Sequence, residues 1–364
     1  MSSIVSTLVN ISCNLIGVGF LALPHFFASI GFMQGVALLF IAGISQCIAA
    51  IILSHSLADQ LSSSSFSEIA VKLKSTRLKC IMEGCLVVQM LANLVISAIV
   101  VADASPILSR DLSAGLGLTV ATFLSLATDL HNFRFSSIAS LVAAIAMLVA
   151  VALADRPDES GPHEATWNFV VASKAWGCCL FAFSFAINVP RLTLEIPRKD
   201  RKRLNLLFTI SVAAAFAFYV AFAAAALRIT SQPQPNFILG LSGNFSFYLR
   251  ALLVLSTIAK MPLSSHPARE ILKNYFPVNS SILTSFLYLS AFFIFRFSGN
   301  LAAGVSLVGA CGSLAASFLF PGLLLRMRAS MEPLLAEPVE AGQTHVMDFM
   351  TIAAILTALP GLIF

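Results

Sequence analysis

Two glycines, Gly17 and Gly19, flank Val18 in the middle of the first apolar segment, and Pro24 follows them. Glycine and proline in an apolar segment predict a break in a helix, and a break leaves backbone N–H and C=O groups without helical partners. Free N–H groups at the start of a helix attract an anion, and free carbonyls attract a cation. The break therefore has the groups to hold a small molecule that carries both charges. Close packing against a neighbouring helix is the other interpretation of the same glycines.

A second group of polar residues interrupts a phenylalanine-rich apolar segment later in the chain. Ser184 and Asn188 lie among the apolar residues, and Pro190 follows them. Proline removes a backbone donor, so we expect free carbonyls near Ala186. A simple proline kink is the alternative. Interrupted helices at corresponding positions of two halves point to a binding site near the middle of the membrane.

The composition predicts the elements that hold these residues. Hydrophobic residues make up 58% of the chain and charged residues 11%, with a mean hydropathy of +0.90. Soluble domains carry about 25% charged residues, so we expect one all-α polytopic membrane domain. Apolar runs of about 20 residues are long enough to cross a bilayer. Eleven such spans are predicted, at approximately 3–27, 32–58, 80–104, 113–128, 135–154, 167–192, 204–227, 245–263, 281–295, 300–325 and 346–364.

Lysine and arginine orient the predicted spans, because they accumulate in cytoplasmic loops. With a cytoplasmic N-terminus, the inner loops hold 14 of these residues and the outer loops hold 4. The basic run from Arg198 to Arg203 then belongs to an inner loop that faces lipid head groups. It is too short to suggest nucleic acid, and no other basic patch suggests one. We expect the protein to be a monomer that is embedded in the lipid bilayer.

Four stretches of the chain resemble the amino acid/auxin permease family, in particular its vacuolar-type branch. They are Asn10 through Pro24, Phe181 through Ser184 with Asn188 and Glu195, Met261 through Arg269, and Val308 through Gly322. The resemblance implies a leucine-transporter-type fold of the amino acid-polyamine-organocation superfamily. In that fold two inverted repeats of five helices, here about 3–154 and 167–325, are followed by one extra helix, about 346–364. The resemblance also implies transport of amino acids by alternating access.

The resemblance places the substrate between the two interrupted helices. The residues carried over by position are Gly17, Val18 and Gly19 on the first helix and Phe183, Ser184, Phe185 and Asn188 on the sixth. A zwitterion needs N–H donors at one end, carbonyl or amide acceptors at the other, and an apolar slot for its side chain. Few fixed charges are needed, so neutral amino acids are favoured. An aromatic ring that only packs is the other interpretation of Phe183.

The chain departs from the family pattern at two positions. Cys13 stands where relatives commonly carry asparagine, and Asn14 is displaced by one residue, which turns a helical side chain by about 100°. Lys260 stands two residues before Pro262, where sodium-coupled relatives have a hydroxyl residue that helps to bind the ion. An ammonium group there would occupy the cation's space, which favours proton coupling or exchange over sodium coupling. Snorkelling of Lys260 to the cytoplasmic surface is the alternative.

Charged residues inside or beside the spans need an explanation, because they are expensive in hydrocarbon. Glu195 matches the family's acid in span six and follows Arg191 by one helical turn. An inner gate or a proton acceptor is one interpretation of Glu195, and a structural ion pair with Arg191 is the other. Asp103 and Arg110 flank the outer end of span three, where we expect an ion pair.

Other functions are less well supported by the sequence. Motifs of zinc hydrolases, serine hydrolases and phosphate loops are missing, so we expect no enzymatic activity, no metal and no organic cofactor. A channel filter usually comes from a re-entrant loop repeated around an axis, whereas two internal halves favour a carrier. A non-transporting amino acid sensor of the same fold stays open, although the first span already begins near Ser3. A proton gradient is the expected driving force, in a vacuolar, lysosomal or plasma membrane.

Overall fold

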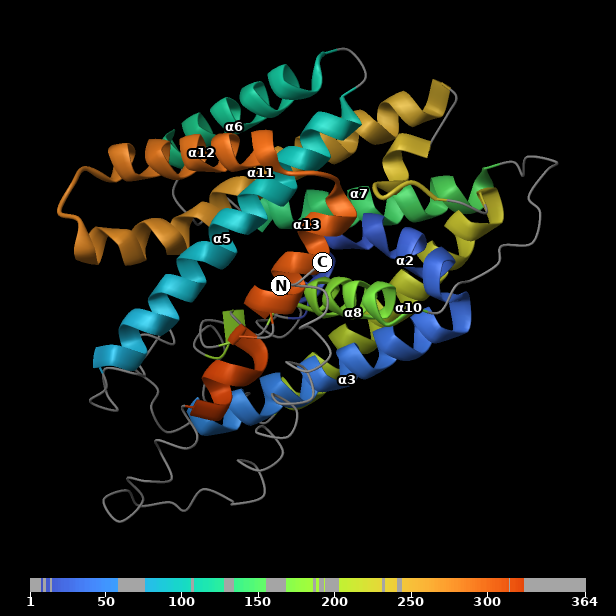
Figure 1. Ribbon diagram of the computed structural model, residues 1–364, viewed down its shortest axis with the longest axis horizontal. Coiled ribbons are helices and arrows are strands. Elements are labelled where there is room, and N and C mark those ends of the chain that lie inside the picture. The colour runs from blue at the N-terminus through green and yellow to red at the C-terminus, as the bar shows by residue number, and fades with distance from the viewer. Residues whose placement is uncertain are drawn as a thin grey trace.

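In the computed structural model, all the regular elements of the described part of the chain are helices (Figure 1). The structure describes residues 8, 11–13, 15–57, 76–105, 108–127, 134–154, 168–185, 188–189, 193, 203–230, 233–240, 244–313 and 315–323. The α-helices are α2 (Leu23–Ile30), α3 (Phe32–Leu57), α5 (Thr76–Ala104), α6 (Arg110–Ala127), α7 (Arg134–Leu153), α8 (Phe169–Ala182), α10 (Leu204–Ile229), α11 (Asn244–Tyr275), α12 (Ser280–Phe297) and α13 (Leu301–Val308). Short 3-10 helices are η1 (Val18–Ala22) and η5 (Phe237–Gly240), and π-helices are η6 (Gly309–Ser313) and η7 (Ala315–Leu319).

Seven helical segments in the described residues are long and apolar enough to cross a membrane. They are Ile11–Ile30, Phe32–Ser54, Lys79–Ala104, Leu204–Ile229, Ser246–Tyr275, Ser280–Phe297 and Leu301–Leu323. Two apolar helices, Ile138–Leu153 and Phe169–Ala182, are shorter. A multi-pass membrane protein is therefore confirmed. The predicted eleventh span, 346–364, lies outside the described residues.

Asparagine side chains begin three of the helices. The Oδ1 atoms of Asn168, Asn279 and Asn300 accept backbone N–H groups in the first turns of α8, α12 and α13. Such caps satisfy donors that have no helical partner. Gly31 separates α2 from α3 and has φ 96°, a left-handed conformation that favours glycine. The three asparagines mark the starts of their helices, and Gly31 marks the boundary between α2 and α3.

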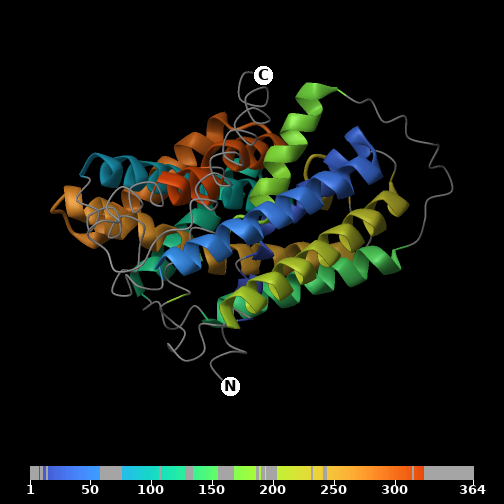
Figure 2. The same ribbon diagram turned by 90° about the horizontal axis from the view of Figure 1, so that it is seen from below.

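The helices form two packed groups, seen at the lower right and the upper left of Figure 1. In one group α8 packs against α2 and α3, and α10 packs against the same two helices. In the other, α5, α6, α11 and α12 pack against one another. Helix α7 contacts both α10 and α11, and Figure 2 shows α3, α10 and α7 running alongside each other. The first group contains predicted spans one and two from the first half of the chain and spans six and seven from the second half. The other group contains spans three and four and spans eight and nine.

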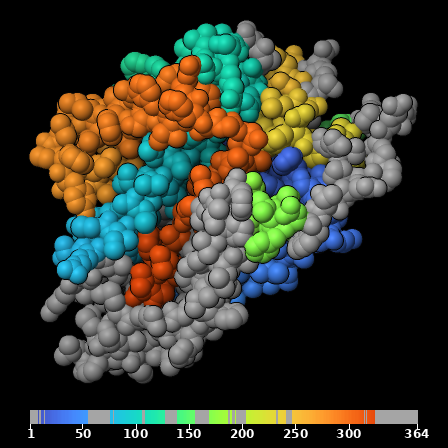
Figure 3. All heavy atoms as spheres, in the orientation of Figure 1, coloured from blue at the N-terminus to red at the C-terminus, as the bar shows by residue number. Residues whose placement is uncertain are grey.

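Span ten lies between the two groups and changes from α-helix to π-helix at Gly309. Helix α13 packs against both α8 and α5, and Figure 3 shows span ten beside α5 on one face of the molecule. A Cβ on Gly309 would lie 1.8 Å from the carbonyl oxygen of Gly177, and a Cβ on Gly177 would lie 2.4 Å from that of Ser306. The Ser306 hydroxyl donates to the Lys174 carbonyl at 2.8 Å. Spans six and ten are therefore in direct backbone contact.

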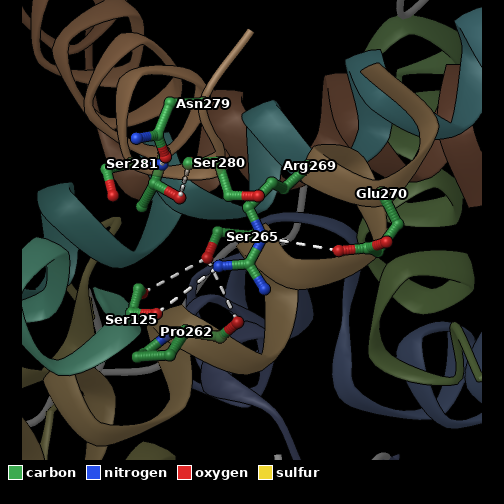
Figure 4. A network of polar contacts seen from close by, with 9 residues as sticks. Ser125, Pro262, Ser265, Arg269, Glu270, Asn279, Ser280 and Ser281 are labelled. Atoms are coloured by element: carbon green, nitrogen blue, oxygen red, sulfur yellow. Dashed lines mark hydrogen bonds and ion pairs between the residues drawn. The ribbon is translucent and has the colours of Figure 1, made fainter. Parts of the chain in front are cut away.

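Span eight is longer than predicted. We expected it to end at residue 263, but α11 continues through Pro262 to Tyr275. Two prolines, Pro262 and Pro267, lie inside this helix. The Ser265 hydroxyl donates to the Pro262 carbonyl at 3.1 Å, and Arg269 donates to the Ser125 carbonyl of α6 at 3.5 Å (Figure 4). The stretch Met261–Arg269 therefore lies inside α11 and joins it to α6.

Candidate functional site

Span one breaks at Ile16 and Gly17, as predicted. Helical residues reach Leu15, and Gly17 is extended, with φ −90° and ψ −172°. Helix η1 then begins at Val18 and runs directly into α2, and no described side chain caps its first turn. Pro24 lies in the first turn of α2, where a missing N–H costs little. The break therefore leaves the N–H groups of a new helix opposite the carbonyls of the old one.

The two glycines of the break have different surroundings. A Cβ on Gly17 would have no heavy atom within 4 Å, whereas a Cβ on Gly19 would lie 2.6 Å from Cδ1 of Phe181. Gly17 is half-buried and Gly19 is buried. Val18 is half-buried and packs against the hydrophobic core. Gly17 thus leaves space beside the backbone, and Gly19 allows span six to pack closely.

Lys260 of α11 reaches the break in span one. Its Nζ atom donates to the carbonyl oxygens of Cys13 at 3.2 Å and Ile16 at 3.3 Å. These carbonyls lie at the C-terminal end of the first half-helix, the end that attracts a cation. The sequence left open whether Lys260 reaches the break or the membrane surface. In the structure its ammonium group binds the break.

Span six breaks at Phe183, seven residues before the proline that we expected to interrupt it. Helix α8 ends at Ala182, and Phe183, Ser184 and Phe185 are irregular. Short-range backbone bonds replace the helical pattern here: the Ser184 N–H donates to the Phe181 carbonyl at 3.0 Å, and the Asn188 N–H donates to the Phe185 carbonyl at 2.9 Å. The polar residue Ser184 therefore lies inside the break itself.

Tyr219 of α10 connects the two breaks. Its hydroxyl oxygen lies 2.6 Å from the carbonyl oxygen of Leu15 and 2.7 Å from that of Ala182. These are the last helical residues before the breaks in spans one and six, and Tyr219 is fully buried. The sequence analysis missed Tyr219. A signal was present, because a tyrosine deep in an apolar span needs a partner for its hydroxyl.

The aromatic residues of the second break face the core. The Phe183 ring is fully buried, with its centroid 5.3 Å from that of Tyr219, and Gly43 of α3 lies beside it. The Phe185 ring is also fully buried and packs against Phe208 at 5.6 Å. Both rings thus contribute to packing between α3, α8 and α10. Their contact with a substrate stays a prediction.

Ser184 turns toward a different helix. It is half-buried, and its hydroxyl accepts the Nε2–H of Gln89, on α5, at 3.2 Å. A Cβ on Gly312 would lie 2.9 Å from Cγ of Gln89, so glycine at that position of span ten leaves room for the amide. Gln89 itself is buried. The second break therefore has a polar contact from the other helix group, one that the sequence analysis did not find.

Of the other site residues predicted from the sequence, Asn188 lies within the described part of the chain. Asn188 is half-buried and follows the break in span six by three residues. Asn14, Arg191 and Glu195 lie outside the described residues, so their predicted roles stay predictions. The structure thus brings together the two breaks, Lys260 and Ser184, and adds Tyr219 and Gln89.

Aromatic rings connect the 233–240 segment to the first break. The Phe237 ring centroid lies 5.5 Å from that of Phe222 on α10, and Phe222 lies 4.7 Å from Phe20 on η1. All three rings are almost fully buried. The segment therefore covers one side of η1 with apolar surface.

Polar contacts hold the same segment in place. Asn236 donates to Asp103 at 3.0 Å, and the Pro233 carbonyl oxygen lies 3.0 Å from Nδ1 of His25 on α2. Arg110 also pairs with Asp103, at 3.3 Å, which confirms the ion pair expected from the sequence. The segment is thus tied to both helix groups at the predicted outer side.

The fold and the breaks define a class: a multi-pass helical membrane protein with two interrupted helices whose broken ends meet. Within that class, a family model described as transmembrane amino acid transporter protein matches residues 1–358, and the chain belongs to this family. Membership indicates amino acid transport across a membrane and a transporter rather than an enzyme. No curated protein sequence matches the chain.

Proposed function

We propose that the protein is a secondary active transporter that moves neutral amino acids by alternating access and without sodium. The observation that carries the proposal is the meeting of the two breaks at Tyr219, 2.6 Å from Leu15 and 2.7 Å from Ala182. Interrupted helices that meet in this way are how transporters build a substrate site within the membrane.

The substrate binds where Gly17 leaves space beside the backbone. Its carboxylate accepts N–H groups from the start of η1, at Val18 and Gly19, where no described side chain competes. Its ammonium group donates to whichever of the Leu15 and Ala182 carbonyls the single hydrogen of Tyr219 does not bind, and Ser184 contributes a hydroxyl from the facing break. Phe183, Phe185 and Asn188 complete the wall of span six. Backbone groups thus recognise the part that all amino acids share.

Lys260 explains both the preference for neutral substrates and the independence from sodium. Its ammonium group already binds the Cys13 and Ile16 carbonyls, which would otherwise be available to a cation. A fixed positive charge at this place repels cationic amino acids as well as Na⁺. Proton coupling or exchange then drives transport, with Glu195, Arg191 and Asn14 as further candidates for ion coupling or gating.

Alternating access follows from the two helix groups. The group of α2, α3, α8 and α10 carries both breaks, and the group of α5, α6, α11 and α12 carries Lys260 and Gln89. Rocking one group against the other would expose the breaks to each side in turn. We propose a leucine-transporter-type arrangement of two five-helix repeats plus one helix. The protein acts as a monomer in a vacuolar, lysosomal or plasma membrane, with a cytoplasmic N-terminus.

Uptake of a labelled amino acid panel into proteoliposomes of the purified protein tests the proposal. The buffer is free of sodium, and a pH gradient is imposed or omitted. We expect saturable uptake of neutral amino acids, with accumulation when the gradient is present. Folded protein that moves no amino acid would contradict the proposal and favour the sensor. Flux that does not saturate would favour the channel.

A further inference from the structure

Helix α5 presents two amide side chains toward the breaks. Gln89 and Asn93 are four residues apart, so they lie one helical turn apart on the same face. Gln89 bonds to Ser184 and lies against Gly312 of span ten. Ile96 continues this face, 3.8 Å from the Cβ position of Gly304. The face that carries both amides is therefore directed at span ten and the second break, not at the lipid.

Asn93 has an acceptor atom that no described residue satisfies. Its Oδ1 atom is buried and has no hydrogen-bond partner in the described part of the chain. Its backbone carbonyl, by contrast, accepts the Ser97 hydroxyl at 2.8 Å. The residue as a whole is partly exposed although its face is directed inward. A buried acceptor without a donor is unfavourable, so a site that keeps one is suited to a ligand that brings the donor.

We propose that Asn93 selects neutral amino acids whose side chains carry a hydrogen-bond donor, such as hydroxyl and carboxamide side chains. This inference rests on the proposed function, because it assigns the side-chain pocket of the same site. The backbone at the breaks holds the ammonium and carboxylate groups, and the substrate side chain extends toward α5. There its O–H or N–H donates to Oδ1 of Asn93.

Gln89 is a positioning residue in this arrangement. Its Nε2–H is used by the Ser184 hydroxyl, which therefore accepts at that bond and turns its own hydrogen elsewhere. Gly312 leaves the room that this orientation requires. Gln89 thus fixes Ser184 on the backbone side of the substrate, while Asn93, one turn further along α5, reads the side chain.

Selectivity follows from the cost of an unpaired polar group. A pocket that hydrogen bonds to its substrate discriminates against an isosteric analogue without the donor, because the acceptor then stays unpaired. Threonine and valine form one matched pair, and asparagine and leucine form another. We expect the donor-bearing member of each pair to be favoured about tenfold, the effect of about one net hydrogen bond.

The test compares uptake of the four amino acids by wild-type protein and by Asn93→Leu in proteoliposomes. We expect the variant to retain uptake of valine and leucine and to lose the preference for threonine and asparagine, with ratios within about twofold. Ser97→Ala is the matched control on the same helix, since its hydroxyl bonds only within α5 among the described contacts, and it should keep the wild-type ratios.

The outcomes separate this inference from the function on which it rests. Wild-type protein that moves none of the four amino acids overturns the proposed function and this inference with it. Wild-type uptake with ratios near one, or ratios unchanged in Asn93→Leu, overturns the inference alone. If Asn93→Leu does not fold, the inference is tested by the thermal stabilisation of the wild-type protein by threonine and by valine. Threonine must then raise the unfolding temperature at lower concentration than valine, and equal effects contradict the proposal.

Discussion

The hydroxyl oxygen of Tyr219 lies 2.6 Å from the carbonyl oxygen of Leu15, at the end of the first half of span one. The same hydroxyl lies 2.7 Å from the Ala182 carbonyl, at the end of the first half of span six. A hydroxyl has one hydrogen, so it can satisfy only one of the two carbonyls at a time. The two broken helices therefore share one donor, and a motion that separates them must break this contact.

Tyr219→Phe removes that donor; the Leu15 carbonyl still accepts the Gly17 N–H at 2.8 Å, but the Ala182 carbonyl loses its contact with the hydroxyl. We expect the free energy of unfolding to fall by about 1–3 kcal/mol, the cost of an unsatisfied buried polar group. Denaturant or thermal unfolding in detergent measures the change. Tyr248→Phe is the control, because Tyr248 is 69% exposed. Equal stability of the two variants would mean that the Tyr219 hydroxyl does not hold the breaks together.

Alanine at the two glycines of span one should have opposite effects. Gly17→Ala places a methyl group in open space, so we expect normal stability and uptake reduced at least about tenfold if substrate binds there. Gly19→Ala drives a methyl group into the Phe181 ring, so we expect a loss of stability of about 1–3 kcal/mol. Unfolding and uptake are measured on the same samples. Unchanged uptake by Gly17→Ala would remove this position from the substrate site.

The contact between spans six and ten should depend on Gly309. Gly309→Ala would bring a methyl carbon to 1.8 Å from the Gly177 carbonyl oxygen, which forces the backbones apart. We expect misfolding, or destabilisation by at least about 3 kcal/mol. Gly304→Ala, on α13 of the same span, would only meet Ile96 and Ile99 at 3.8 Å and should be tolerated. Similar stability of the two variants would show that the backbone contact is not required.

The 233–240 segment should loosen when its link to α5 is removed. Asn236→Leu deletes the bond to Asp103 and also the acceptor of the Ile238 N–H, at 3.4 Å, and it keeps a side chain of similar size, so the amides of Phe237, Leu239 and Gly240 report the link to α5. Hydrogen exchange of these three amides should become several-fold faster, because local opening limits exchange in such segments. Asp111→Asn, at an exposed pair with Arg296, should leave this exchange unchanged. If Asn236→Leu had no effect either, the aromatic contacts alone would hold the segment.

Much of the fold could be predicted, because apolar runs of membrane length are direct consequences of the bilayer. The span-one break at Gly17 could also be predicted, because the effect of glycine on the backbone is local. Ser184 was predicted to interrupt span six and lies inside the break, whereas the free carbonyls expected near Ala186 lie outside the described residues. At the start of the break, Tyr219 of α10 contacts the Ala182 carbonyl. A tyrosine deep in an apolar span signals that its hydroxyl needs a partner, but no local pattern says which carbonyl that partner is.

The contacts of the site were harder to predict than its backbone. Lys260 was found because it replaces a family residue, but two destinations were compatible with the sequence. Only the packing of α11 beside span one decides between them, by bringing Nζ to the Cys13 and Ile16 carbonyls. Gln89 and Asn93 belong to no recognised motif. The role of an amide side chain in a membrane helix can be inferred only when its neighbours are known.

The sodium dependence of uptake in wild-type protein and in Lys260→Thr tests the central claim most directly. Lys273→Thr, further along α11, is the matched control. We expect wild-type protein and Lys273→Thr to accumulate neutral amino acids equally well with and without sodium when a pH gradient is imposed. Lys260→Thr should lose this sodium-independent uptake, and any uptake that it retains should require added sodium. Wild-type uptake that requires sodium, or a Lys260→Thr variant with unchanged sodium-independent uptake, would contradict the account.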